Sequence, residues 1–230
     1  MDKIQTVKSI SIWIFLVPFI SINLCLILIT EFQWIFPNQE DIIHNTFPYI
    51  DGGSSISRTV RAYPNWLIFK PSMFLTSFLL IKYWLINKEI IKHFNQNNKH
   101  IKKIVFFGIT SAVALSIHSI FLGIDFDNDL YKLFRRVIML SFIIFEITAQ
   151  AYLVATFYSF KDELNRYINS KYLKMKLILV SILIVVAIFS VPFLGLPGNK
   201  FLKHALEWNY FLGVITFYLL TFFMWNKKTN

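Results

Sequence analysis

The sequence predicts an all-α polytopic membrane protein, a single bundle of six transmembrane helices with both termini in the cytosol. Two observations predict this class. The 230-residue chain is 56% hydrophobic and only 16% charged, which is too apolar for an ordinary soluble domain. Its charged residues also separate apolar blocks of about 20 residues, the helix length that crosses the hydrocarbon core of a bilayer.

Reading between the charges gives six expected spans. Five are uninterrupted or nearly so: residues 9–30, 104–124, 137–160, 177–199 and 208–226. The sixth, residues 66–84, contains Lys70 and Lys82, but both lie near its ends, where a long side chain can carry its ammonium group to the lipid headgroups. The longest connection is then residues 31–65, which contains the polar stretch around Gly52 and Gly53.

The basic residues predict the orientation of the spans. The connections on the side of the termini hold 15 lysines and arginines, counting Lys82, against 8 on the other side. Because lysine and arginine concentrate in cytosolic connections, both termini should be cytosolic and residues 31–65 luminal. This pattern also explains the net charge of +10 without nucleic acid, for which no binding module is present. Cys25 has no second cysteine to pair with.

One acidic residue falls inside a span. Glu146 lies about ten residues into the fourth span, with Gln150 one turn later on the same helix face. An ionisable group at that depth normally faces the bundle interior and has a partner. We interpret Glu146 as a neutral, hydrogen-bonded structural carboxyl, with a proton or ion relay and a ligand contact as alternatives.

Other polar residues are expected at the luminal ends of the spans. His118, His204 and Glu207 are the candidates for acid-base catalysis, although the more conservative interpretation is structural. No metal-ligand spacing, phosphate-binding loop or nucleophile motif occurs, so we expect neither a metal nor a cofactor. The candidate ligand-binding residues are Asp51, Ser54, Ser55, Ser57, Arg58, Asp125, Arg135, Glu146 and Trp208.

The length of the luminal connection suggests a role beyond joining two spans. Gly52 and Gly53 permit a sharp reversal of the chain, which would fold the serines and Arg58 back over the helix ends. We expect this connection to form a lid over a pocket bounded by the side chains of His118, Arg135, His204 and Glu207. In that arrangement Arg58 would pair with Asp125, with Glu207 or with a lipid phosphate. The alternative is a mobile linker.

Two stretches resemble a known family. FPYIDGGSSISR (residues 47–58) resembles the proline-aromatic, serine-rich motif in the first luminal loop of a six-span superfamily. HALEWNYFLGVITFYLLTFFMW (residues 204–225) is similar to its aromatic-rich last helix, which opens on a glutamate beside an aromatic residue. This superfamily contains the damage-regulated autophagy modulators, yeast plasma-membrane relatives involved in phospholipid homeostasis, and the post-GPI-attachment factor of the Golgi. The resemblance implies six spans, cytosolic termini and a role in lipid or GPI-anchor handling.

Three functions are compatible with the sequence. The first is a membrane factor in lipid handling or in remodelling of phospholipids or GPI anchors, which binds a membrane lipid or glycolipid at the luminal side. The second is an intramembrane lipid hydrolase or acyl-remodelling enzyme using His118 or His204 as base. The third is a small proton-coupled transporter using Glu146. We favour the first, in the Golgi, the endoplasmic reticulum or another endomembrane, with the plasma membrane as the alternative location.

Overall fold

The structure is a computed structural model that describes residues 2–44, 46–124, 128–194 and 198–225. These residues fold into a bundle of helices, and their only strand-like pairing is one isolated bridge between Ile168 and Trp225. The long helices are α1 (Asp2–Glu31), α3 (Asn65–Phe94), α4 (Ile101–Phe121), α5 (Asp129–Ser159), α7 (Ser170–Leu194) and α8 (Lys200–Met224). Shorter elements are η1 (Gln33–Ile35), η2 (Gln39–Asp41), α2 (Ile56–Arg61) and α6 (Lys161–Leu164). The predicted all-α class is confirmed.

Within the described residues, five helices are long and apolar enough to cross a membrane. They are α1, α4, α5, α7 and α8. Helix α3 is as long as α1 but carries Lys70 and Lys82, and it packs against both α1 and α4. The Lys70 ammonium donates a hydrogen bond to the Ile120 carbonyl oxygen at 3.3 Å, near the luminal end of α4. That position agrees with the expected placement of Lys70 at the end of a span, and the sixth span stays a prediction.

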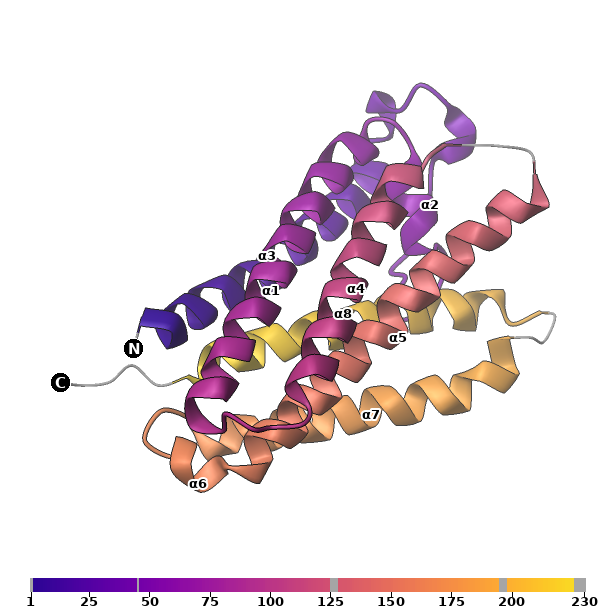
Figure 1. The fold of residues 1–230 in the computed structure, drawn as a ribbon. Coiled ribbons are helices and arrows are strands. Elements are labelled where there is room, and N and C mark those ends of the chain that lie inside the picture. Colours follow the sequence, from indigo (N-terminus) through magenta and orange to yellow (C-terminus); the bar gives the residue numbers. More distant parts are fainter. Residues whose placement is uncertain (1, 45, 125–127, 195–197, 226–230) are drawn as a thin grey trace.

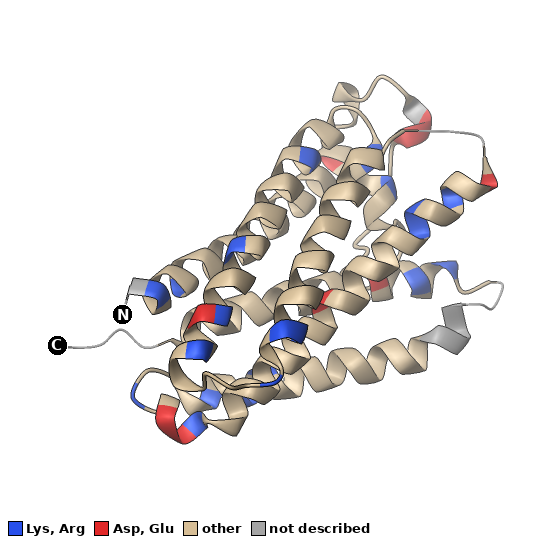
Figure 2. Ribbon diagram, viewed as in Figure 1, with Lys and Arg blue, Asp and Glu red and all other residues tan. Residues whose placement is uncertain are grey.

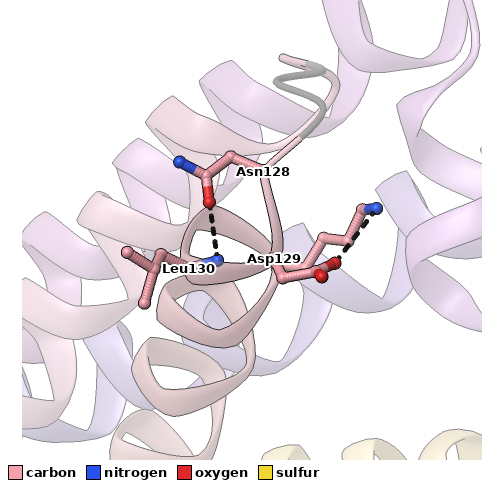
Figure 3. Close-up of polar contacts among 4 residues, drawn as sticks. Asn128, Asp129 and Leu130 are labelled. Carbon is pink, nitrogen blue, oxygen red and sulfur yellow. Dashed lines mark hydrogen bonds and ion pairs between the residues drawn. The ribbon is translucent and has the colours of Figure 1, made fainter.

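Several helices extend well beyond the apolar intervals. α5 begins at Asp129, eight residues before the expected start of its span, and α8 begins at Lys200 rather than Trp208. An apolar interval reflects the thickness of the hydrocarbon, whereas a helix ends where capping groups or breakers end it. At the start of α5 the Asn128 side chain accepts a hydrogen bond from the Leu130 amide at 2.9 Å, and Lys132 lies 3.5 Å from Asp129 (Figure 3).

The bundle has two distinct ends (Figure 1). The start of α1, the α3–α4 turn, α6 and the end of α8 lie at one end, which we call the cytosolic end. There the Lys8 ammonium donates to the Trp225 carbonyl oxygen at 2.7 Å. α2, η1, η2 and the start of α8 lie at the opposite end, which we call the luminal end after the predicted orientation. Figure 2 shows that charged residues gather toward both ends and are sparse along the middle of the helices, as expected for a membrane protein.

The luminal connection between α1 and α3 is folded. Its residues form a small apolar cluster with the end of α1, consisting of Ile29, Phe36, Ile42, Ile43 and Ala62. The Asn65 amide joins three elements, because it donates to the carbonyl oxygens of Cys25 at 2.8 Å and of Thr59 at 2.7 Å. These contacts fix α2 against the ends of α1 and α3, above the interior of the bundle.

Candidate functional site

A cavity of about 380 Å³ lies inside the luminal half of the bundle. Every long helix contributes to its wall, and α2 contributes at the luminal end. The wall is mostly apolar, and on α3 it follows one helical stripe of Phe69, Met73, Thr76 and Leu80. On α8 the lining runs from Lys203 to Tyr218, a helical rise of roughly 22 Å. The cavity is therefore about as deep as one leaflet of hydrocarbon, roughly 15 Å, plus its polar margin.

The inner end of the cavity is a polar floor built around Glu146. One carboxylate oxygen of Glu146 accepts a hydrogen bond from the Ser111 hydroxyl at 2.6 Å. The other accepts from the Gln150 amide at 3.1 Å and from the Tyr218 hydroxyl. Glu146, Ser111 and Gln150 are completely buried. Since the donors come from α4, α5 and α8, this carboxylate joins three helices, which agrees with the interpretation of Glu146 as a structural group with partners.

The luminal end of the cavity, its mouth, is lined by polar side chains that include Ser57, His118, Lys203 and Glu207. The Glu207 carboxylate accepts hydrogen bonds from the backbone N–H groups of Ile56 and Ser57, in the first turn of α2. These N–H groups have no partner within the helix, so Glu207 on α8 satisfies the start of α2. The mouth thus combines a lysine, a histidine and a hydroxyl with a carboxylate that already has partners.

The stretch from Tyr49 to Ser57 is fastened onto the first turns of α8. The His204 ring nitrogen Nδ1 lies 2.9 Å from the Gly52 carbonyl oxygen, and the Trp208 indole donates to the Ser54 carbonyl oxygen at 2.8 Å. The Asn209 amide donates to the Tyr49 carbonyl oxygen at 2.7 Å. The Tyr49 and Trp208 rings also meet edge to face, with centroids 4.9 Å apart.

Gly52 is the point of closest approach in this docked stretch. Its φ is 62°, in the left-handed region, and a Cβ built on it would overlap the carbonyl oxygen of Phe201 on α8. Only glycine fits both the backbone conformation and the contact. The predicted reversal at Gly52 is present, and it brings the connection down onto α8 beside the cavity mouth.

Several predicted ligand residues support this local structure. Asp51 accepts hydrogen bonds from the Thr46 hydroxyl at 2.7 Å and from the amides of Phe47 and Gly53, both at 2.7 Å. The Thr46 hydroxyl, followed by the two amides, holds the pKa of Asp51 below its ordinary value. Ser55 is the N-cap of α2, where it accepts from the Arg58 amide at 3.2 Å.

Other predicted residues lie nearer the cavity. Ser57 and Glu146 line it, whereas Ser54 is buried with its hydroxyl 3.3 Å from that of Thr59. The indole of Trp208 is completely buried and, as described above, holds the docked stretch. Among the described residues Arg58 has no hydrogen-bond or ion-pair partner for its side chain, and Glu207 is instead paired with α2.

Arg135 on α5 and His118 on α4 form a second polar group near the mouth. The Arg135 guanidinium lies 5.9 Å from the centre of the Tyr131 ring and close enough to His118 to act on it electrostatically. The Arg135 Nε and the His118 Nδ1 are both buried without a hydrogen-bond partner in the described part of the chain. Asp125, a predicted neighbour, lies outside the described residues.

The structure does not assemble a histidine–carboxylate pair from the described residues. Within the described ranges no carboxylate forms a hydrogen bond or ion pair with His118, and His204 contacts the Gly52 carbonyl oxygen instead of Glu207. The described residues also contain no group of three or more histidine, cysteine or acidic side chains that could hold a metal ion. The arrangement is suited to binding an amphiphilic molecule, because a long apolar space ends in a polar, partly basic mouth.

Sequence reasoning missed two features of the interior. Lys203 belongs to the luminal basic residues, and the sequence gives no sign that it lines the cavity mouth. Lys176 was counted among the cytosolic residues, yet its side chain is completely buried, where its ammonium donates to the Thr221 hydroxyl at 2.8 Å and lies 3.9 Å from the Phe217 ring centre. In the sequence, His204, Glu207, Tyr218 and Thr221 fall on one helical stripe, and this polar pattern is the signal that indicates interior partners on α8.

The fold and the cavity define a class, the polytopic helical membrane proteins with an internal amphiphile-sized cavity. A comparison with family models is more specific. The model described as the Frag1/DRAM/Sfk1/Cwh43P N-terminal domain matches residues 7–225, and the chain belongs to this family. Neither the search of curated proteins nor the search of solved structures found a match. The resemblance noted from the two sequence stretches is thereby confirmed.

Proposed function

We propose that this protein is an integral membrane factor that binds a phospholipid or glycolipid, with a hydrocarbon chain in the cavity and the headgroup at its luminal mouth. The single observation that carries the proposal is the shape and polarity of the cavity. It has an apolar wall about one leaflet deep, and its exposed polar groups lie at the luminal end. A lipid of the luminal leaflet has the same order of polar and apolar parts.

The charges at the mouth support a phosphate-containing headgroup. Lys203 lines the mouth beside the His118 ring, which can donate a hydrogen bond, and Arg58 and Arg135 are nearby with side-chain nitrogens that have no partner among the described residues. A guanidinium or ammonium group binds phosphate oxygens through charge-assisted hydrogen bonds. The negative charge of Glu207 weakens this preference for phosphate only in part, because the backbone amides of α2 already bind its carboxylate. In the cell, the proposed role is lipid handling or remodelling of phospholipids or GPI anchors in an endomembrane.

Native mass spectrometry of the detergent-purified protein tests the proposal, with a matched pair of variants. Met73 is buried and lines the cavity, so Met73→Trp should fill the space and remove a co-purified lipid. Phe74 is the next residue, lies outside the lining and is 41% exposed on the outer face, so Phe74→Trp should retain that lipid.

Circular dichroism and thermal unfolding serve to check that both variants are folded. The proposal is supported if Met73→Trp loses the lipid and Phe74→Trp retains it. Equal lipid occupancy in the two folded variants, or the absence of any lipid from the parent protein, would show that the cavity does not bind lipid.

A further inference from the structure

The wall of the cavity is incomplete on one side, between the luminal halves of α5 and α7. The buried residues of α5 begin only at Glu146, so none of the seventeen residues from Asp129 to Phe145 is buried. On α7 the last buried residue is Leu183 among those whose side chains are described, up to Ser190. The luminal halves of these helices therefore do not pack against each other as their cytosolic halves do.

The closed part of this side lies deeper in the bundle. Ile147 of α5, Leu183 of α7 and Val214 of α8 form one buried apolar cluster, at the level of the cavity floor. Above the cluster, Leu140 and Ile144 of α5 line the cavity although they are 53% and 58% exposed. Each of these side chains therefore lies on the cavity wall and also on the outer surface of the bundle. No second layer of protein separates the cavity from the surroundings at this place.

The opposite approach, from the lumen, is covered. α2 and the stretch from Tyr49 to Ser57 lie over the mouth and are held to α8 by the contacts of His204, Glu207, Trp208 and Asn209. A hydrocarbon chain entering from the lumen would also have to cross water. An opening that faces the bilayer exposes the chain to apolar surroundings throughout its entry.

The volume of the cavity limits what can enter. An apolar protein cavity of about 150 Å³ accommodates one benzene, which corresponds to roughly 25 Å³ per carbon. The 380 Å³ found here then holds about 15 carbons, which is one acyl chain and not two. A lipid with two chains can use this cavity only if its second chain stays outside, and the gap between α5 and α7 provides the space for that.

We propose that a two-chain phospholipid of the luminal leaflet inserts one acyl chain into the cavity through the gap between α5 and α7, while its second chain stays in the bilayer. This inference rests on the proposed function and adds the route of entry and the number of chains bound. The gap is a lateral opening, bordered by Leu140 and Ile144 on α5 and by Val186 and Ala187 on α7.

Closing the gap tests the proposal. Cysteines replace Leu140 and Ala187, and a reducible thiol-reactive bridging reagent joins them in nanodiscs; native Cys25 is completely buried. The probe is chain-deuterated dipalmitoyl phosphatidylglycerol, and native mass spectrometry follows its replacement of the unlabelled bound lipid. We expect the bridge to slow exchange at least tenfold and reduction to restore it. Each single-cysteine variant is measured with and without the reagent, and the reagent should leave the exchange rate of that variant unchanged because it can form no bridge.

A second pair of variants covers the case in which the double variant does not fold or does not form the bridge. Leu140→Trp should narrow the gap and slow exchange, whereas Val137→Trp should not, because Val137 is 49% exposed and outside the lining. Lateral entry would be overturned if the bound lipid exchanged at the parent rate in the protein with a verified bridge. Equal exchange rates in the two tryptophan variants would overturn it as well. Neither result would affect the proposed function. An absence of bound lipid in the parent protein would overturn the proposed function, and this inference with it.

Discussion

Replacing Gly52 by alanine should detach the luminal stretch from α8. Gly52 combines a left-handed φ of 62° with a position against the Phe201 carbonyl oxygen. An L-residue in that conformation costs roughly 1–2 kcal/mol. The obstructing atom belongs to the backbone of α8, so the loop must move, and the contact of its Gly52 carbonyl with His204, 2.9 Å long, is then lost at about 1 kcal/mol.

The two losses together come to about 2–3 kcal/mol. At 1.4 kcal/mol per factor of ten, the detached state should become roughly 30 to 150 times more populated. Gly198 provides the control, because its φ of 89° is also left-handed but a Cβ there would meet no atom within 4 Å. Gly198→Ala should therefore carry the backbone strain without detaching the loop.

The assay measures the accessibility of a cysteine placed at Ser54, which belongs to the docked stretch and has a completely buried side chain. Its rate of reaction with a water-soluble maleimide should rise 30- to 150-fold in Gly52→Ala and stay at the parent value in Gly198→Ala. The chain without this cysteine is the blank, since Cys25 is buried. An unchanged rate in Gly52→Ala, or an equal rise in Gly198→Ala, would refute the argument from close approach.

Three further predictions concern the floor, the loop and the topology. Glu146→Gln should fold but lose about 1–2 kcal/mol of stability, because the Gln amide brings two N–H donors where the neutral carboxyl brings one O–H, among side chains that already donate to this site. In thermal unfolding, adding Tyr218→Phe to this variant should cost less stability than it does in the parent protein. The Thr46 hydroxyl stabilises the ionised Asp51 carboxylate, so the stability that Asp51 gives to its turn should be complete at pH values above its ordinary pKa of 3.8. This stability should be lost progressively as the pH falls below that value. Limited proteolysis of the loop should show this dependence, and Asp51→Asn should remove it. A cysteine at exposed Asn97 should react with an impermeant maleimide only from the cytosolic side; labelling from the lumen would reverse the orientation.

Much of the local structure could be predicted from the sequence. Apolar length marked the spans, because the hydrocarbon thickness sets how many residues a helix needs, and that is a property of contiguous residues. The depth of Glu146 followed from counting along its span, and the reversal at Gly52 followed from the lack of a side chain. The helical spacing of His204, Glu207 and Tyr218 in the sequence is typical of one polar face, and Tyr218 on that face contacts Glu146.

The cavity and its contacts depended on the tertiary structure. Ser111 and Tyr218, the partners of Glu146, lie 35 and 72 residues from it, and helical periodicity indicates a face without saying which helix will lie opposite. The gap between α5 and α7 has no sequence signature for a physical reason. In a soluble protein an apolar face must be buried, but lipid is as apolar as a helix interior, so Leu140 could equally face lipid, another helix or a cavity. Only the packing of the six long helices decided which of these it does.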